Sequence, residues 1–105
     1  MKRIMLVDDE IMLLDLYKDL FEANGYDVVA TATDGGEAVF LYLKLVTNDK
    51  KPDIVIMDYR MPFKNGVDAT QEILSLDPQA KIIVASADAT VGEEVRSKGA
   101  LEFVH

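Results

Sequence analysis

Short apolar runs alternate with longer segments of helical period along the chain, and this alternation limits the folds open to it. Three of the runs are almost continuously apolar and rich in β-branched residues, which is typical of strands covered on both faces by helices. Strands joined through helices pair in parallel by right-handed crossovers. We therefore predict an α/β fold with a doubly wound parallel sheet. Its five strands would be Ile4 to Val7, Val28 to Ala32, Ile54 to Met57, Ile82 to Ala85 and Leu101 to Val104.

The first two helical segments carry signals for where they begin and end. The first is predicted to start near Asp9 or Glu10 and to stop at Gly25, because glycine readily adopts the left-handed conformation that ends a helix. The second follows Asp34, an N-cap candidate with Glu37 three positions later in capping-box spacing. We expect the first helix to place one apolar stripe on the sheet: Leu13, Leu14, Tyr17, Leu20 and Phe21.

Two further helices are predicted in the second half of the chain. One spans about residues 67 to 76 and ends at Asp77-Pro78, since proline cannot continue a helix. The other covers about residues 90 to 98. It is the weakest of the four, because Gly92 interrupts it and few of its residues are apolar.

The composition narrows the class of protein. A chain of 105 residues has the size of one compact domain, which we assign to residues 1–105. No apolar stretch approaches the roughly 20 residues of a membrane span, so we expect a cytoplasmic protein without a membrane anchor. The absence of cysteine excludes disulfides and thiolate metal sites. A formal net charge of -8, with lysine and arginine scattered along the chain, argues against direct binding of nucleic acid.

Acidic and hydroxyl side chains follow three of the apolar runs. Asp8 and Asp9 come directly after the first run, Asp58 directly after the third and Ser86 directly after the fourth. In doubly wound sheets, ligands bind beyond the carboxyl ends of the strands, where the strand order reverses. One edge therefore gathers these residues, and its carboxylates indicate a site for a divalent cation and a phosphoryl group. Taken singly, each residue has a simpler explanation in helix capping or turn chemistry.

Six segments match one known family, in the expected order over the whole chain: Ile4 to Glu10, Asp34 to Ala38, Asp53 to Pro62, Asn65-Gly66, Ser86-Ala87 and Gly99-Ala100. On these segments the chain resembles the receiver domain of bacterial and archaeal two-component response regulators. The resemblance implies a flavodoxin-like fold with a five-stranded parallel sheet of order 2-1-3-4-5. It also implies a signalling phosphoprotein that acts by changing conformation and binding, and not an enzyme that turns over a small substrate.

The resemblance also implies roles for individual residues. Asp58 would accept a phosphoryl group from a sensor histidine kinase, and Ser86 would contact a phosphoryl oxygen. Mg²⁺ or Mn²⁺ would be held directly by Asp9 and Asp58, and by Asp8 through a water molecule. The backbone carbonyl of Arg60 would complete the metal site.

The family pattern departs at the carboxyl end. Residues 99 to 105 match a run that continues in the family into Lys-Pro and a last helix, whereas this sequence ends at His105. We therefore expect a truncated receiver that lacks the last helix and leaves part of one sheet face uncovered. Such a face would favour self-association or a swapped dimer. Phe103 matches an aromatic position that packs inward or outward with the phosphorylation state, and a buried core phenylalanine is the alternative.

Other functions are compatible with an α/β fold of this size. A non-phosphorylated protein-interaction module, or an inactive truncated receiver fragment, would fit the missing lysine. A phosphohydrolase with an aspartyl intermediate would need a second acid two residues after Asp58, where Arg60 stands. A flavin binder would need a phosphate loop rich in Ser, Thr or Gly after the first run, where three acids stand. The sequence favours the phosphoaccepting receiver, with a downstream output domain or partner protein.

Overall fold

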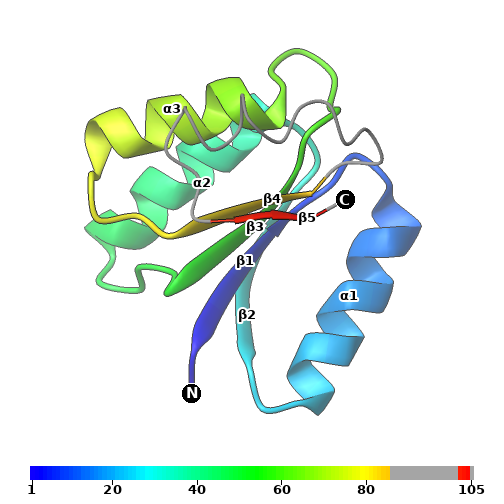
Figure 1. Ribbon diagram of the computed structural model, residues 1–105. Coiled ribbons are helices and arrows are strands. Elements are labelled where there is room, and N and C mark those ends of the chain that lie inside the picture. Colours follow the sequence, from blue (N-terminus) through cyan, green and yellow to red (C-terminus); the bar gives the residue numbers. More distant parts are fainter. Residues whose placement is uncertain (86–101, 105) are drawn as a thin grey trace.

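The computed structural model describes residues 1–85 and the strand at residues 102–104. Within these residues the chain forms five strands and three helices (Figure 1). The strands are β1 (Arg3–Val7), β2 (Asp27–Ala32), β3 (Ile54–Asp58), β4 (Ile82–Ala85) and β5 (Glu102–Val104), and the helices are α1 (Ile11–Ala23), α2 (Gly35–Thr47) and α3 (Gly66–Leu76). The predicted α/β class is confirmed. Each apolar run lies in a strand within one residue of its predicted bounds.

The five strands form one parallel sheet in the order β2-β1-β3-β4-β5. The order implied by the family resemblance is therefore confirmed. Because β1 lies between β2 and β3, the chain first moves to one edge of the sheet and then crosses to the other side of β1. In the pairing of β1 with β3, Val7 lies opposite Met57, so both strands end at the same edge.

Helices cover both faces of the sheet, α1 on one side and α2 with α3 on the other (Figure 1). The side chains of β1 alternate between these layers, as strand geometry requires. Ile4 and Leu6 pack in one apolar cluster with Leu14 of α1. Met5 and Val7 belong to the larger cluster on the side of α2 and α3. Burial on both faces explains why the central strands are apolar at consecutive positions.

Helix α1 departs from its prediction in where it begins and in how much of its stripe is buried. It begins at Ile11, one to two residues later than expected, and Glu10 is the N-cap. Leu14 is buried, but Tyr17 and Leu20 remain 38% and 52% exposed. Among the described elements α1 alone lies on this face (Figure 1), and its apolar stripe is wider than its contact with the sheet. The stop is as predicted, since Gly25 follows the C-cap residue with a φ of +87°.

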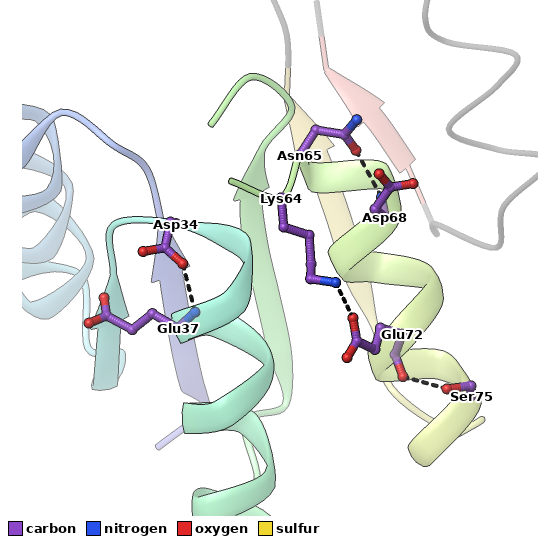
Figure 2. A network of polar contacts seen from close by, with 7 residues as sticks. All are labelled: Asp34, Glu37, Lys64, Asn65, Asp68, Glu72 and Ser75. Carbon is purple, nitrogen blue, oxygen red and sulfur yellow. Dashed lines mark hydrogen bonds and ion pairs between the residues drawn. The ribbon is translucent and has the colours of Figure 1, made fainter. Parts of the chain in front are cut away.

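The beginnings of α2 and α3 are fixed by side-chain caps (Figure 2). Asp34 accepts a hydrogen bond of 2.8 Å from the Glu37 backbone N–H, as the capping-box spacing predicts. The Glu37 carboxylate reaches back to the N–H of Thr33 at 2.7 Å, one residue before the N-cap. Asn65 caps α3 by accepting 2.9 Å from the Asp68 N–H. These caps satisfy amide groups that a helix start leaves without partners.

The predictions for the third and fourth helices have different outcomes. The third helix was expected over about residues 67 to 76, and α3 (Gly66–Leu76) confirms it. The fourth, at about residues 90 to 98, lies outside the described residues. Across residues 1–85, no helix is long and apolar enough to cross a membrane.

Candidate metal centre

The three predicted acids lie together at the edge where β1 and β3 end. Asp8 and Asp9 directly follow β1, and Asp58 is the last residue of β3. One carboxylate oxygen from each residue lies within 4.8 Å of the other two. Asp8 and Asp58 are partly buried, while Asp9 is exposed. The sheet therefore brings together acids that are up to fifty positions apart in the sequence, as the strand-end argument predicts.

Backbone hydrogen bonds extend the sheet one residue beyond the strands and hold these acids in place. The N–H of Asp8 donates to the Ala32 carbonyl at the end of β2, at 3.0 Å. The N–H of Tyr59 donates to the Ala85 carbonyl at the end of β4, at 2.8 Å. Asp8 and Asp58 are thus positioned by the hydrogen bonds of the sheet, and Asp9 follows directly in the turn.

The local structure argues against simple helix capping by Asp8 and Asp9. The N-cap of α1 is Glu10, which makes no side-chain capping bond, and the first turn of the helix contains no acid. The Asp8 carboxylate accepts 2.9 Å from the N–H of Glu10, which precedes the helix. This bond orients Asp8 within the turn between β1 and α1. Neither acid therefore takes the place in the helix that a capping role would require.

Burial and mutual repulsion raise the proton affinity of the cluster. Burial raises the pKa of Asp58 from 3.8 to about 6, and the charges of Asp8 and Asp9 add to the shift. Burial also raises the pKa of Asp8, partly offset by the hydrogen bond from Glu10. Partly buried carboxylates that lie this close disfavour one another's ionised forms. A bound cation would reverse this preference by compensating their charge.

Two glycines allow close backbone packing around the loop between Asp58 and α3. A Cβ on Gly66 would overlap with the backbone carbonyl of Asp58, and a Cβ on Gly35 would overlap with the carbonyl of Lys64. The Gly66 N–H also donates 2.7 Å to the Tyr59 carbonyl, which closes the loop. The first turns of α2 and α3 therefore both pack against the segment that follows Asp58. Neither contact was predictable from the sequence, because nothing local shows which backbone segment approaches a glycine.

The other predicted site residues are placed only in part. Arg60 lies in the loop two residues after Asp58, with its guanidinium carbon 6.0 Å from the centre of the Tyr59 ring. Ser86 lies outside the described residues, although Ala85 before it pairs with Asp58. Phe103 lies in β5 opposite Val84, and its side chain is outside the description. The roles of these three residues stay predictions.

Comparisons with known proteins agree on one family. The family model described as "Response regulator receiver domain" matches residues 4–105. The chemotaxis protein CheY of Thermotoga maritima is 45% identical over 106 residues, which cover 98% of this chain and 83% of the relative. The CheY of Listeria monocytogenes is 36% identical over 106 residues, covering 99% of this chain and 85% of the relative.

Solved structures show the same relationship. The chain is similar to a protein in the CheX-CheY-BeF3-Mg²⁺ complex from Borrelia burgdorferi, with a TM-score of 0.89 and 30% identity over 98% of this chain and 76% of that one. It is also similar to the response regulator TrrA of Thermotoga maritima in complex with Mg²⁺ and BeF, with a TM-score of 0.82 and 36% identity over 99% of this chain and 85% of that one. Sequence and fold thus lead to the same conclusion: this chain belongs to the response regulator receiver domain family.

Proposed function

We propose that this receiver accepts a phosphoryl group on Asp58, at a metal site formed with Asp8 and Asp9. Receiver domains are signalling domains whose family function is to accept phosphate. The observation that supports this assignment is the cluster of three carboxylates within 4.8 Å at the carboxyl edge of β1 and β3. Asp58 stands at the end of the central strand β3, beside both other acids.

The donor set fits Mg²⁺. All three side chains offer carboxylate oxygens, which hard divalent cations prefer, and no soft ligand is present among them. We assign Asp9 and Asp58 as direct ligands, Asp8 as a ligand through water, and the Arg60 carbonyl as a further donor. Mn²⁺ would accept the same oxygens. When bound, the cation supplies positive charge that neutralises the acids and the phosphoryl oxygens.

The chemistry of Asp58 follows from its protonation. A carboxylate oxygen of Asp58 attacks the phosphorus of a phosphohistidine, an O–P bond forms, the N–P bond breaks, and the histidine nitrogen takes up a proton. The attacking group must be ionised. Because the pKa of metal-free Asp58 is about 6, the protonated fraction of Asp58 grows as the pH falls below that value. Asp8 and Asp9 would therefore serve the reaction by holding the cation, whose positive charge would favour the ionised form of Asp58.

The partners follow from the same reaction. We propose that this receiver acts in the cytoplasm, with a sensor histidine kinase as the phosphoryl donor and a downstream domain or protein as the target of the signal. Ser86 would contact a phosphoryl oxygen, and Phe103 would report the phosphorylated state to that partner. The output is therefore a change in binding and not the turnover of a small substrate.

Small-molecule phosphorylation tests the proposal. The protein is incubated with acetyl phosphate and Mg²⁺, and its intact mass is measured against a sample containing a chelator. We expect a metal-dependent gain of one phosphoryl group in the wild type and in Asp53→Asn, and none in Asp58→Asn. Asp53 is a matched control because it directly precedes β3, at the amino ends of the strands. There its carboxylate accepts a hydrogen bond from the Arg3 N–H. No gain in the wild type, or an undiminished gain in Asp58→Asn, would refute the assignment.

A further inference from the structure

The outward face of α2 is unusually apolar for a surface helix. Of its thirteen residues only Glu37 and Lys44 are charged. Phe40, Leu43 and Val46 are 65%, 41% and 40% exposed, although the opposite side of the helix is already buried in the core. A surface helix normally carries polar residues on its outer face. α2 instead exposes three large apolar side chains beside its two charged residues, which indicates a second contact surface.

The neighbouring helix shows that this property is specific to α2. α3 packs on the same face of the sheet (Figure 1). Its exposed positions are mainly polar, and Figure 2 shows Asp68, Glu72 and Ser75 on its surface. Although both helices pack on the same face of the sheet, the outer face of α3 is mainly polar, whereas that of α2 carries large apolar side chains. Beside α2, a hollow with apolar and polar lining reaches the edge strand β2; it is lined by Val29, Ala30, Leu41, Lys44, Leu45, Asn48 and Lys50.

The two charges of α2 have a spacing that is self-complementary. Glu37 and Lys44 are seven residues apart, about two helical turns, and therefore lie on the same flank of the helix. Figure 2 shows the Glu37 side chain on the side of α2 that points away from α3. In an antiparallel pair of α2 helices with a two-fold axis between residues 40 and 41, residue 37 of one copy faces residue 44 of the other. Each Glu37 then meets the second copy's Lys44, and Phe40 lies beside the axis.

Both charged groups are available for such pairs. The Thr33 N–H and hydroxyl both donate to Oε1 of Glu37, and no hydrogen bond to Oε2 occurs within the described part of the chain. In the same part of the chain, the ammonium group of Lys44 takes no part in an ion pair. A helix face with an apolar centre and oppositely charged ends on one flank fits a second copy of itself in antiparallel orientation.

We propose that α2 is the contact surface of a symmetric, antiparallel homodimer, with Phe40 and Leu43 at its centre and Glu37–Lys44 pairs at its ends. This surface lies on the opposite side of the sheet from the exposed stripe of α1, and it does not require phosphorylation of Asp58. One short helix per copy provides less area than a standard interface of about 1,600 Å² in total. The net charge of -8 on each copy also opposes association. The dimer is therefore weak and forms at high protein concentration.

Sedimentation equilibrium over a concentration series tests the surface. We expect reversible dimerisation of the wild type, weakened at least roughly tenfold by Phe40→Glu at the centre of the contact. Leu20→Glu is the matched control, because Leu20 is also an exposed apolar helix residue but lies on α1. It should leave the dimerisation constant unchanged. A wild type that stays monomeric up to a protein concentration of about 1 mM would overturn the proposal, because a dissociation constant above about 1 mM is too weak for a specific contact. Loss of dimerisation in Leu20→Glu but not in Phe40→Glu would also overturn it.

A charge-swap experiment tests the antiparallel arrangement. Lys44→Glu and Glu37→Lys each place like charges opposite one another, so each variant alone should associate more weakly than the wild type. Mixed in equal amounts, they should form a heterodimer, because the two acids on α2 of the Lys44→Glu chain then face the two lysines on α2 of the Glu37→Lys chain. A mixture that associates no better than its components would refute the arrangement. If Glu37→Lys fails to fold through loss of its bond to Thr33, the order wild type above Lys44→Gln above Lys44→Glu is required instead.

Discussion

Asp58 occupies a position in which its charge depends on its surroundings. It ends the central strand β3, is partly buried, and has two further acids beside it. Burial and these charges raise its pKa to about 6. Without a cation, the neutral form of this carboxyl group is therefore favoured. In the function proposed above, the acceptor must be ionised, so metal binding and reactivity would be coupled at this one side chain.

The raised pKa predicts how stability depends on pH in metal-free protein. Between about pH 4 and pH 6, the folded state binds more protons at Asp58 than the unfolded state, whose pKa is 3.8. The contribution of Asp58 to stability is therefore fully favourable below this range and is lost as the pH rises through 6. Asp58→Asn removes the effect and should be more stable than the wild type by about 1 kcal/mol at neutral pH, a value discounted for solvent screening.

Urea denaturation of both proteins with a chelator measures this effect. The difference in free energy of unfolding between Asp58→Asn and the wild type should grow between about pH 4 and pH 6 and then level off. The contributions of other acids, such as Asp53 and Asp77, to the pH dependence cancel in this comparison. The pKa values of both are lowered by hydrogen bonds and nearby cations. A difference that does not vary with pH would contradict the environment described for Asp58.

At the scale of elements, the first turns of α2 and α3 support the loop between Asp58 and α3. Gly35 lies against the backbone of Lys64, and Gly66 lies against the backbone of Asp58. The ion pair between Lys64 and Glu72 further ties the loop to α3 (Figure 2). Two helix starts thus determine where the segment after Asp58 runs.

Alanine substitutions test these close contacts. Gly35→Ala and Gly66→Ala should each lower the free energy of unfolding by about 2 kcal/mol, because the added methyl group displaces backbone atoms. Gly66→Ala should also weaken Mg²⁺ binding, since it displaces Asp58. Gly36→Ala is the control within the same helix turn, because a Cβ there meets only the Asp34 carboxylate, at 3.3 Å. It should be neutral or stabilising by up to about 1 kcal/mol. Equal losses at Gly35 and Gly36 in thermal or urea unfolding would contradict this account.

A second link joins α2 to the end of α3. The buried Tyr42 donates 2.6 Å from its hydroxyl to Asp77, which also pairs with Lys51 at 2.8 Å. Tyr42→Phe removes the tyrosine bond and leaves Asp77 with Lys51, so we expect a loss of about 1 to 2 kcal/mol in urea unfolding. Tyr17→Phe on exposed α1 should change stability by less than about 0.5 kcal/mol. Equal effects of the two substitutions would show that the Tyr42 bond contributes nothing specific.

Local signals and tertiary contacts differ in how well the sequence predicts them. The start of α2 was predicted from Asp34, because a cap depends on residues only three positions apart. Asn65 caps α3 with the same spacing but was not identified from the sequence. The exposure of Tyr17 and Leu20 on α1 was not predictable, since it depends on how much of the helix its neighbours cover. The apolar outer face of α2 was missed for the same reason. Periodicity identifies an apolar stripe, but it does not show whether another element packs on it.

At the scale of the whole molecule, parallel pairing makes one edge of the sheet strongly acidic. The fold could be predicted from the alternating runs and from the family resemblance. That the acids lie at one edge of the sheet could be predicted from the positions of the strand ends. Their separation of less than 4.8 Å required the register of β1 against β3, which pattern alone does not fix. The pKa of Asp58 likewise required its burial in three dimensions.

The acid cluster predicts a large response of thermal stability to Mg²⁺. A ligand that binds only the folded state at a hundredfold excess over its Kd stabilises by about 2.7 kcal/mol, or about 10 °C in Tm for a chain of this size. Scanning calorimetry should show this rise in the wild type and a much smaller one in Asp9→Asn. Because the net charge of -8 responds to any salt, NaCl of equal ionic strength is the control. An equal rise with NaCl would exclude a specific site.

The pairing of β1 with β3 also has a consequence for the order of folding events. Asp8 and Asp58 are fifty positions apart, with α1, β2 and α2 between them, and they meet only when these two strands pair. Forming contacts so distant in sequence requires closing a long loop of chain, which slows folding. A nascent or partly folded chain therefore lacks the acid cluster. The cluster comes into existence together with the centre of the sheet, so the proposed cation site would exist only in a chain that has completed its central fold.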